Sequence, residues 1–229
     1  MQEKSMGTAE QMDSDEIRAA ASASMAAGQD IRERVRDLTL QALQARKFDL
    51  AGMREVMRAM TEGINAGVGK NGRDVRHALS EAFAGMDQAL TKAAQAGSLA
   101  MKELAARGRE FSQTELKQGL ENMRTMESDF LDAVRQVSRS AAGVVKTEWD
   151  DLIAHAQRAG TDTGRVIAGT TREFSARMAA SMSEGAVAGM EAARTFGERF
   201  AALASGILAG MSEALRPEKD VTEKRDRKA

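Results

Sequence analysis

Apolar residues recur along this chain at the spacing of one face of an α-helix. They return every three or four positions, as Ile17 and Ala21 do near the start. This spacing matches the 3.6-residue turn of a helix, whereas a strand would need strict alternation of apolar and polar positions. The pattern therefore predicts amphipathic helices over residues 13–215. The polar ends at 1–12 and 216–229 are expected to be disordered.

Local signals divide this region into four or five helices. Asp13 and Glu16 have the spacing of a capping box, so the first helix is expected to begin near Ser14. Glycine clusters and further capping residues mark the later boundaries. Glycine weakens a helix, and a capping residue marks the position where a helix starts. The expected breaks lie near 63–72, 108–112, 143–147 and 160–164.

Three of these breaks depend on capping residues. Ser112 and Thr147 each have an acidic residue three positions later, as in a capping box. Thr161 or Asp162 is the expected N-cap of a last helix that runs to about Leu215. Helices joined by short loops favour an all-α fold, either an antiparallel helical bundle or a coiled-coil-like assembly.

The apolar stripe is most regular between Val75 and Leu152, where 21 steps cover 77 residues, about 3.67 residues per step. This spacing is that of an 11-residue repeat rather than of a heptad. It fits a right-handed supercoil of packed helices, and it also fits a helix that lies flat on an apolar surface. The side chains expected to form this apolar surface or core face are Phe83, Met86, Leu90, Phe111, Phe130, Phe174, Phe196 and Phe200.

The composition favours a thin core between closely packed helices. Aromatic residues make up only 3% of the chain, whereas methionine occurs 15 times in 229 residues. Methionine fills irregular gaps and also adapts to soft apolar partners such as lipid. A methionine stripe at helical spacing is more often core than binding face, and both interpretations stay open at this point.

Patterns for catalysis or metal binding are weak in this sequence. Residues 67–72 match G-x-G-x-x-G, but a predicted helix precedes them where a dinucleotide site needs a strand. His77 and His155 stand far apart, and the chain has no cysteine for a thiolate site. We therefore expect no catalytic residue, no cofactor, no metal and no enzymatic activity.

Charge and hydropathy narrow the possible partners. The net charge of −1 argues against nucleic acid, whose binding proteins carry a clear basic excess. Acids and bases are mixed along the helices, so a surface bound by them is expected to be neutral and apolar. No stretch is long and apolar enough for a membrane span. The polar first residues do not fit a secretory signal, so we expect a cytoplasmic protein.

Two alanine- and glutamine-rich amphipathic segments carry the character of a known family. They are residues 38–46 (LTLQALQAR) and 86–96 (MDQALTKAAQA). In these the chain resembles the phasins, bacterial proteins that coat polyester storage granules. The resemblance implies a cytoplasmic, granule-associated, oligomeric coat. The expected function is thus binding of a storage granule or lipid surface through amphipathic helices. The alternative is a homo-oligomeric scaffold or adaptor that binds another protein.

Overall fold

A computed structural model describes residues 12–45, 50–69, 74–106, 113–181 and 190–213, and every regular element in them is an α-helix. The all-α class expected from the periodicity is therefore confirmed. The helices are α1 (Ser14–Ala27), α2 (Ile31–Gln44), α3 (Leu50–Gly67), α4 (Val75–Ala106), α5 (Gln113–Ser138), α6 (Gly143–Ala159), α7 (Asp162–Ser181) and α8 (Met190–Glu213).

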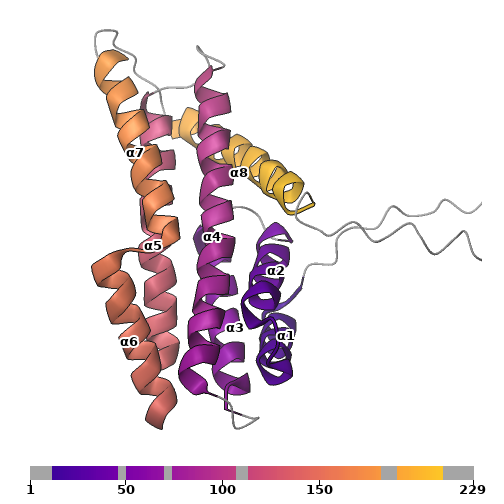
Figure 1. The fold of residues 1–229 in the computed structure, drawn as a ribbon. Helices are drawn as coiled ribbons and strands as arrows, with labels where there is room; N and C mark the ends of the chain where they lie inside the picture. The colour runs from indigo at the N-terminus through magenta and orange to yellow at the C-terminus, as the bar shows by residue number, and fades with distance from the viewer. Residues whose placement is uncertain (1–11, 46–49, 70–73, 107–112, 182–189, 214–229) are drawn as a thin grey trace, which may run out of the picture.

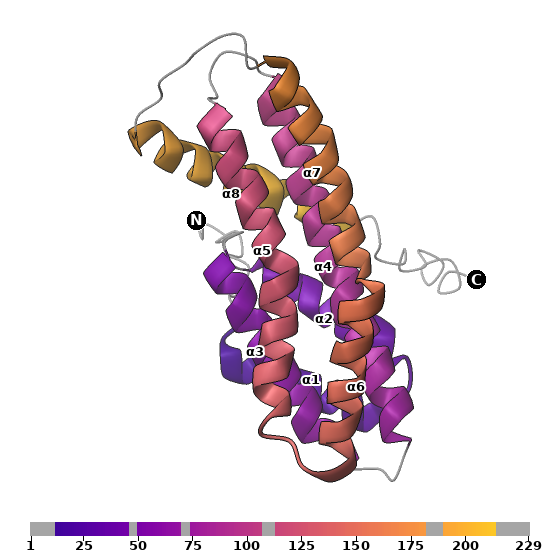
Figure 2. The same ribbon diagram turned by 90° about the vertical axis from the view of Figure 1, so that its left-hand side faces the viewer.

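A long bundle of α4, α5, α6 and α7 forms the body of the molecule (Figure 1). Its central member is α4, whose 32 residues span about 48 Å at the rise of an α-helix. Helix α5 runs antiparallel to α4, and α6 and α7 follow each other back along both (Figure 2). The remaining helices pack on the other side of α4 and α5. Helices α1, α2 and α3 cover one end, and α8 crosses the other (Figure 1).

The core of the bundle is rich in small and flexible side chains. The largest fully buried residues include Trp149, Phe130 and Phe174, but most of the core is alanine, leucine and methionine. Among its fully buried methionines are Met57, Met60, Met86, Met101 and Met123. Small side chains let helix backbones approach closely, which agrees with the thin core expected from the composition.

Two predicted helix starts are confirmed by their hydrogen bonds. Asp13 Oδ1 accepts hydrogen bonds from the N–H groups of Asp15 and Glu16 at 2.9 and 2.8 Å. Glu16 Oε2 accepts from Asp13 N–H at 2.9 Å, which completes the capping box. Thr161 Oγ1 accepts from Gly164 N–H at 2.8 Å, so Thr161 is the N-cap of α7.

The glycines at 63 and 67 are helical, although the sequence pattern placed them in a loop. Helix α3 continues to Gly67 because these positions touch the backbone of α1. A Cβ atom at Gly63 would lie 2.3 Å from the carbonyl oxygen of Arg18, and one at Gly67 would lie 2.4 Å from that of Ser22. Close helix contact, rather than chain reversal, requires glycine here. The rest of that predicted loop, at 70–72, lies outside the described residues.

Other boundaries differ from the prediction for local reasons. Thr147 lies inside α6, where its hydroxyl donates to Gly143 O at 3.4 Å, so it does not cap a helix. Gly28, with φ of 66°, ends α1 at a break that the pattern did not indicate. The predicted last helix to Leu215 is instead two elements, because α8 lies across α4 rather than extending α7 (Figure 1).

The remaining boundary predictions fall outside the described residues. The break expected at 108–112, with Ser112 as a cap, is among them, as are the polar ends apart from Met12. Within the part of the chain that the structure describes, no helix combines the length and apolar character that a membrane crossing requires.

Candidate functional site

The apolar face identified from the sequence lies inside the bundle wherever its side chains are described. Met86, Leu90, Phe130, Phe174 and Phe200 are buried in the core, and Phe83 is half-buried. The rings of Phe83 and Phe130 join α4 to α5, with centroids 5.1 Å apart. Phe111 lies outside the described residues, and so does the side chain of Phe196 in α8.

Two large apolar side chains are exposed among the described residues. Leu99 on α4 is 47% exposed, and Val144 at the start of α6 is 62% exposed. Isolated apolar residues on a surface are ordinary and do not mark a binding site by themselves. An apolar surface would therefore reach most of the face described above only after helices separate.

A polar cluster interrupts the apolar core where α6 meets α7. Asp87 of α4 is nearly buried, and its carboxylate faces the first turn of α7. Its Oδ2 accepts from Asp162 N–H at 2.9 Å. Its Oδ1 accepts from Thr163 N–H at 3.2 Å and from Thr163 Oγ1 at 2.7 Å. The carboxylate thus satisfies N–H groups that begin a helix and lack partners within it.

A second carboxylate holds the same turn from α5. Glu127 Oε1 accepts from Thr161 Oγ1 at 2.6 Å and from Thr161 N–H at 3.3 Å. A hydrogen bond of 3.2 Å also joins Thr91 Oγ1 of α4 to Thr163 Oγ1. We call Asp87, Thr91, Glu127, Thr161 and Thr163 the α7 anchor. It ties the junction of α6 and α7 to both α4 and α5.

Burial raises the pKa of Asp87 above its ordinary value. The hydrogen bonds from Thr163 and the positive charge of Arg165 act in the opposite direction, but desolvation is the largest effect. A perturbed carboxyl can indicate an active site. Here, however, its oxygens accept hydrogen bonds from the first turn of α7, and the arrangement is that of a structural cap.

Of the α7 anchor, local sequence patterns predicted Thr161 alone, as an N-cap. Asp87 and Glu127 contact α7 across 76 and 34 residues of chain, and no local motif encodes such distances. The available signal was Asp87 itself. It lies on α4 between the buried residues Met86 and Ala89, and a charged residue that is buried is nearly always paired.

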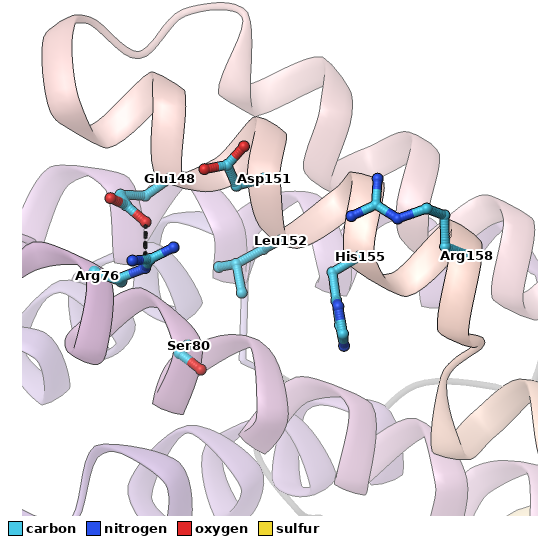
Figure 3. A pocket seen from close by; sticks show the side chains of 7 residues that line it. All are labelled: Arg76, Ser80, Glu148, Asp151, Leu152, His155 and Arg158. Carbon is cyan, nitrogen blue, oxygen red and sulfur yellow. Dashed lines mark ion pairs between the residues drawn. The ribbon is translucent and has the colours of Figure 1, made fainter.

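A charged groove lies between the first turns of α4 and helix α6 (Figure 3). Its volume is about 400 Å³, within the range of small-molecule sites. One ion pair crosses it, with Arg76 Nε 3.3 Å from Glu148 Oε2. The groove is lined by Arg76, Ser80, Glu148, Asp151, Leu152, His155 and Arg158.

The lining of the groove suits a polar partner better than a chemical reaction. Among the described residues that line it, Leu152 is the one apolar side chain, whereas small-molecule sites are mostly apolar. His155 lies in the groove and His77 is exposed on α4, so the two histidines do not form one site. Among the described residues, no group of three or more histidines and carboxylates could hold a metal ion.

Comparisons with known proteins identify the family. Neither the curated proteins nor the solved structures give a match to this chain. One family model matches residues 7–217, which is most of the sequence. The chain therefore belongs to DUF6781, a family of unknown function.

Proposed function

We propose that this protein is a non-enzymatic helical protein that binds an apolar surface, such as a storage granule or lipid, through its amphipathic helices. One observation carries the proposal. The bundle hides a long apolar face whose side chains are mostly small or flexible, from Met86 and Leu90 in α4 to Phe174 in α7. The phasin resemblance adds a polyester granule to the surfaces that such a face suits.

Opening of the bundle on an apolar surface exchanges one apolar contact for another. Removing a large apolar side chain from water contributes about 1.5–3 kcal/mol, whether it packs in a core or against lipid. Opening the bundle in water would forfeit that contribution, whereas opening on an apolar surface would recover it. The surface would then act as a ligand that binds the open state better than the closed one and shifts the population towards it.

The polar faces of the helices indicate what kind of surface this is. Acids and bases alternate there and often pair, as Lys146 does with Asp150 at 2.6 Å and Arg32 with Glu81 at 2.7 Å. Helices that bind anionic membranes carry many lysines and arginines on this face. The mixed charges here favour a neutral surface.

Flotation with triolein droplets tests the proposal. The full chain is mixed with droplets at low and at moderate salt and centrifuged, and the floating fraction is assayed for protein. Circular dichroism of the same mixtures reports helicity. We expect the protein to float at both salt concentrations and to stay helical, because the contact is apolar. A protein that stays in the aqueous phase at both salts would contradict the proposal.

A second candidate function is a homo-oligomeric scaffold or adaptor that binds another protein. The charged groove between α4 and α6 favours it, because its arginines and carboxylates could pair with a mixed-charge segment of a partner. Light scattering with and without droplets separates the two. A stable oligomer whose mass and helicity do not change when droplets are added would favour the scaffold function.

A further inference from the structure

Helices α6 and α7 form one side of this bundle. Both pack against α4 and α5, and the two run on from each other through Gly160 and Thr161 (Figure 2). We call residues 143–181 the α6–α7 arm. Its buried side chains, including Trp149, Ile153 and Phe174, face α4 and α5.

The seam under the arm contains interhelical hydrogen bonds in the buried core, whereas the ion pairs that join α1 to α3 and α2 to α4, Arg18–Glu62 and Arg32–Glu81, are partly exposed. At its centre, the α7 anchor joins the arm to Asp87 and Glu127 through hydrogen bonds. Water can replace these bonds once the seam opens. The other seams are closed by glycines in backbone contact. A Cβ atom at Gly63 would lie 2.3 Å from a carbonyl oxygen of α1, and one at Gly85 would lie 2.5 Å from a carbonyl oxygen of α2. The arm is thus the side of the bundle best suited to separate.

Trp149 gives the arm a donor that has no partner within the described part of the closed bundle. Its side chain is fully buried, and its Nε1 has no acceptor among the described residues. Buried tryptophan N–H groups usually find an acceptor. Tryptophan is enriched at membrane–water interfaces, where its ring lies in apolar surroundings and its N–H group contacts polar ones. A surface that combines apolar chains with carbonyl oxygens would satisfy both parts of the side chain.

The end of the arm at Gly143 has features of a hinge, and it also offers an exposed side chain that an apolar surface could contact first. Residues 139–142 connect α5 to α6 in a mostly exposed turn, and Gly143 has a φ of 56°, which favours glycine. Val144 follows directly and is the more exposed of the two exposed large apolar residues in the described chain. An apolar surface can therefore touch this end of the arm before the seam opens.

We propose that the α6–α7 arm swings away from α4 and α5 to bind a neutral apolar surface, with Trp149 donating a hydrogen bond to an ester carbonyl of that surface. This inference rests on the proposed function, and it adds that the α6–α7 arm is the segment that binds and that the surface carries ester groups. The polar face of the arm mixes acids and bases, as in Lys146, Asp150 and Arg158. The arm therefore fits a neutral surface better than an anionic one.

Fluorescence of Trp149 tests which segment binds, because it is the one tryptophan of the chain. The full protein is mixed with triolein droplets in which part of the acyl chains are brominated, since bromine quenches indole on contact. We expect at least half of the emission of the floating protein to be lost relative to unbrominated triolein. Hexadecane droplets, which lack ester groups, should bind at least threefold less protein.

A disulfide across the seam tests whether the arm must open. Thr91 and Thr163 have Oγ1 atoms 3.2 Å apart, so cysteines at both positions are close enough to form the bond. The chain has no other cysteine. We expect the oxidised double variant T91C/T163C to float at least tenfold less than the same protein after reduction. The two single variants should not respond to reductant, and circular dichroism of the oxidised form checks that it is folded.

The outcomes separate the two proposals. Flotation of the oxidised double variant equal to that of its reduced form would overturn the opening of the arm and leave surface binding intact. Flotation without quenching of Trp149 would assign the binding to another segment. Equal binding to hexadecane would overturn the role of the ester group. Failure of the wild-type chain to float on any droplet would overturn the proposed function itself.

Discussion

Asp87 of α4 accepts a hydrogen bond of 2.7 Å from the hydroxyl group of Thr163, which lies in the first turn of α7, 76 residues later in the chain. The same carboxylate accepts from two backbone N–H groups of that turn. A helix normally receives its cap from a residue directly before it. Here α7 has a local cap, Thr161, and a distant one supplied by another helix.

Replacing Asp87 with alanine should destabilise the fold. The change leaves the N–H groups of Asp162 and Thr163 without acceptors, and a buried group in that condition costs about 1–3 kcal/mol. Urea unfolding followed by circular dichroism measures the loss. Asp150→Ala is the matched control, because it removes only an exposed ion pair with Lys146, worth about 0.5 kcal/mol. Equal losses in the two variants would show that the distant cap contributes nothing.

The stability contributed by Asp87 should depend on pH in a defined direction. Burial raises its pKa above the ordinary value of 3.8. The folded state therefore binds its proton more tightly than the unfolded state does. The contribution is fully present below pH 3.8 and is lost as the pH rises through the folded pKa. Asp87→Asn does not titrate, so the free energy of unfolding of the wild type minus that of the variant should be larger near pH 3 than near pH 7. The opposite trend would refute the raised pKa.

Two glycine-to-alanine changes should have opposite effects. A Cβ atom at Gly63 would meet the backbone of α1, which cannot move aside cheaply, so Gly63→Ala should cost about 1–3 kcal/mol through overpacking. Gly206 of α8 faces open space. Gly206→Ala should therefore stabilise by about 0.5–1 kcal/mol, because alanine is the better helix former. Thermal unfolding of both variants checks the signs, and a destabilising Gly206→Ala would contradict the open environment.

Trp149→Phe should be much milder than Trp149→Ala. Alanine leaves a large cavity and should cost about 3–5 kcal/mol. Phenylalanine keeps most of the apolar contact and removes the N–H group that has no acceptor among the described residues, so its cost should stay below about 1.5 kcal/mol. Urea unfolding of both variants gives the comparison. A loss for phenylalanine as large as that for alanine would mean that the N–H group is well satisfied in the native state.

Features that depend on neighbouring residues could be predicted from the sequence. The helical period follows from apolar spacing, and the caps at Asp13 and Thr161 each act within three residues. Gly63 was misjudged because glycine usually marks a turn, whereas here it serves contact with a helix about 45 residues away. Local spacing cannot distinguish these two uses.

The candidate site was harder to predict for the same reason. The apolar face was identified by its period, but the sequence could not distinguish a core from a binding surface. Which helices lie side by side decides the partners of Asp87 and Glu127. It also decides that Trp149 Nε1 has no acceptor among the described residues. Those adjacencies result from packing of the whole chain.

The α7 anchor also fixes the axial register of the bundle. Apolar contacts are not directional, so those between the arm and its neighbours fix its axial position less sharply than hydrogen bonds do. A slide of the arm by one helical turn covers about 5.4 Å. The same slide would carry Thr161 and Thr163 away from Asp87 and Glu127 and leave two carboxylates facing apolar side chains. The buried polar layer therefore adds to the apolar packing in specifying one alignment, as single polar residues do in coiled coils.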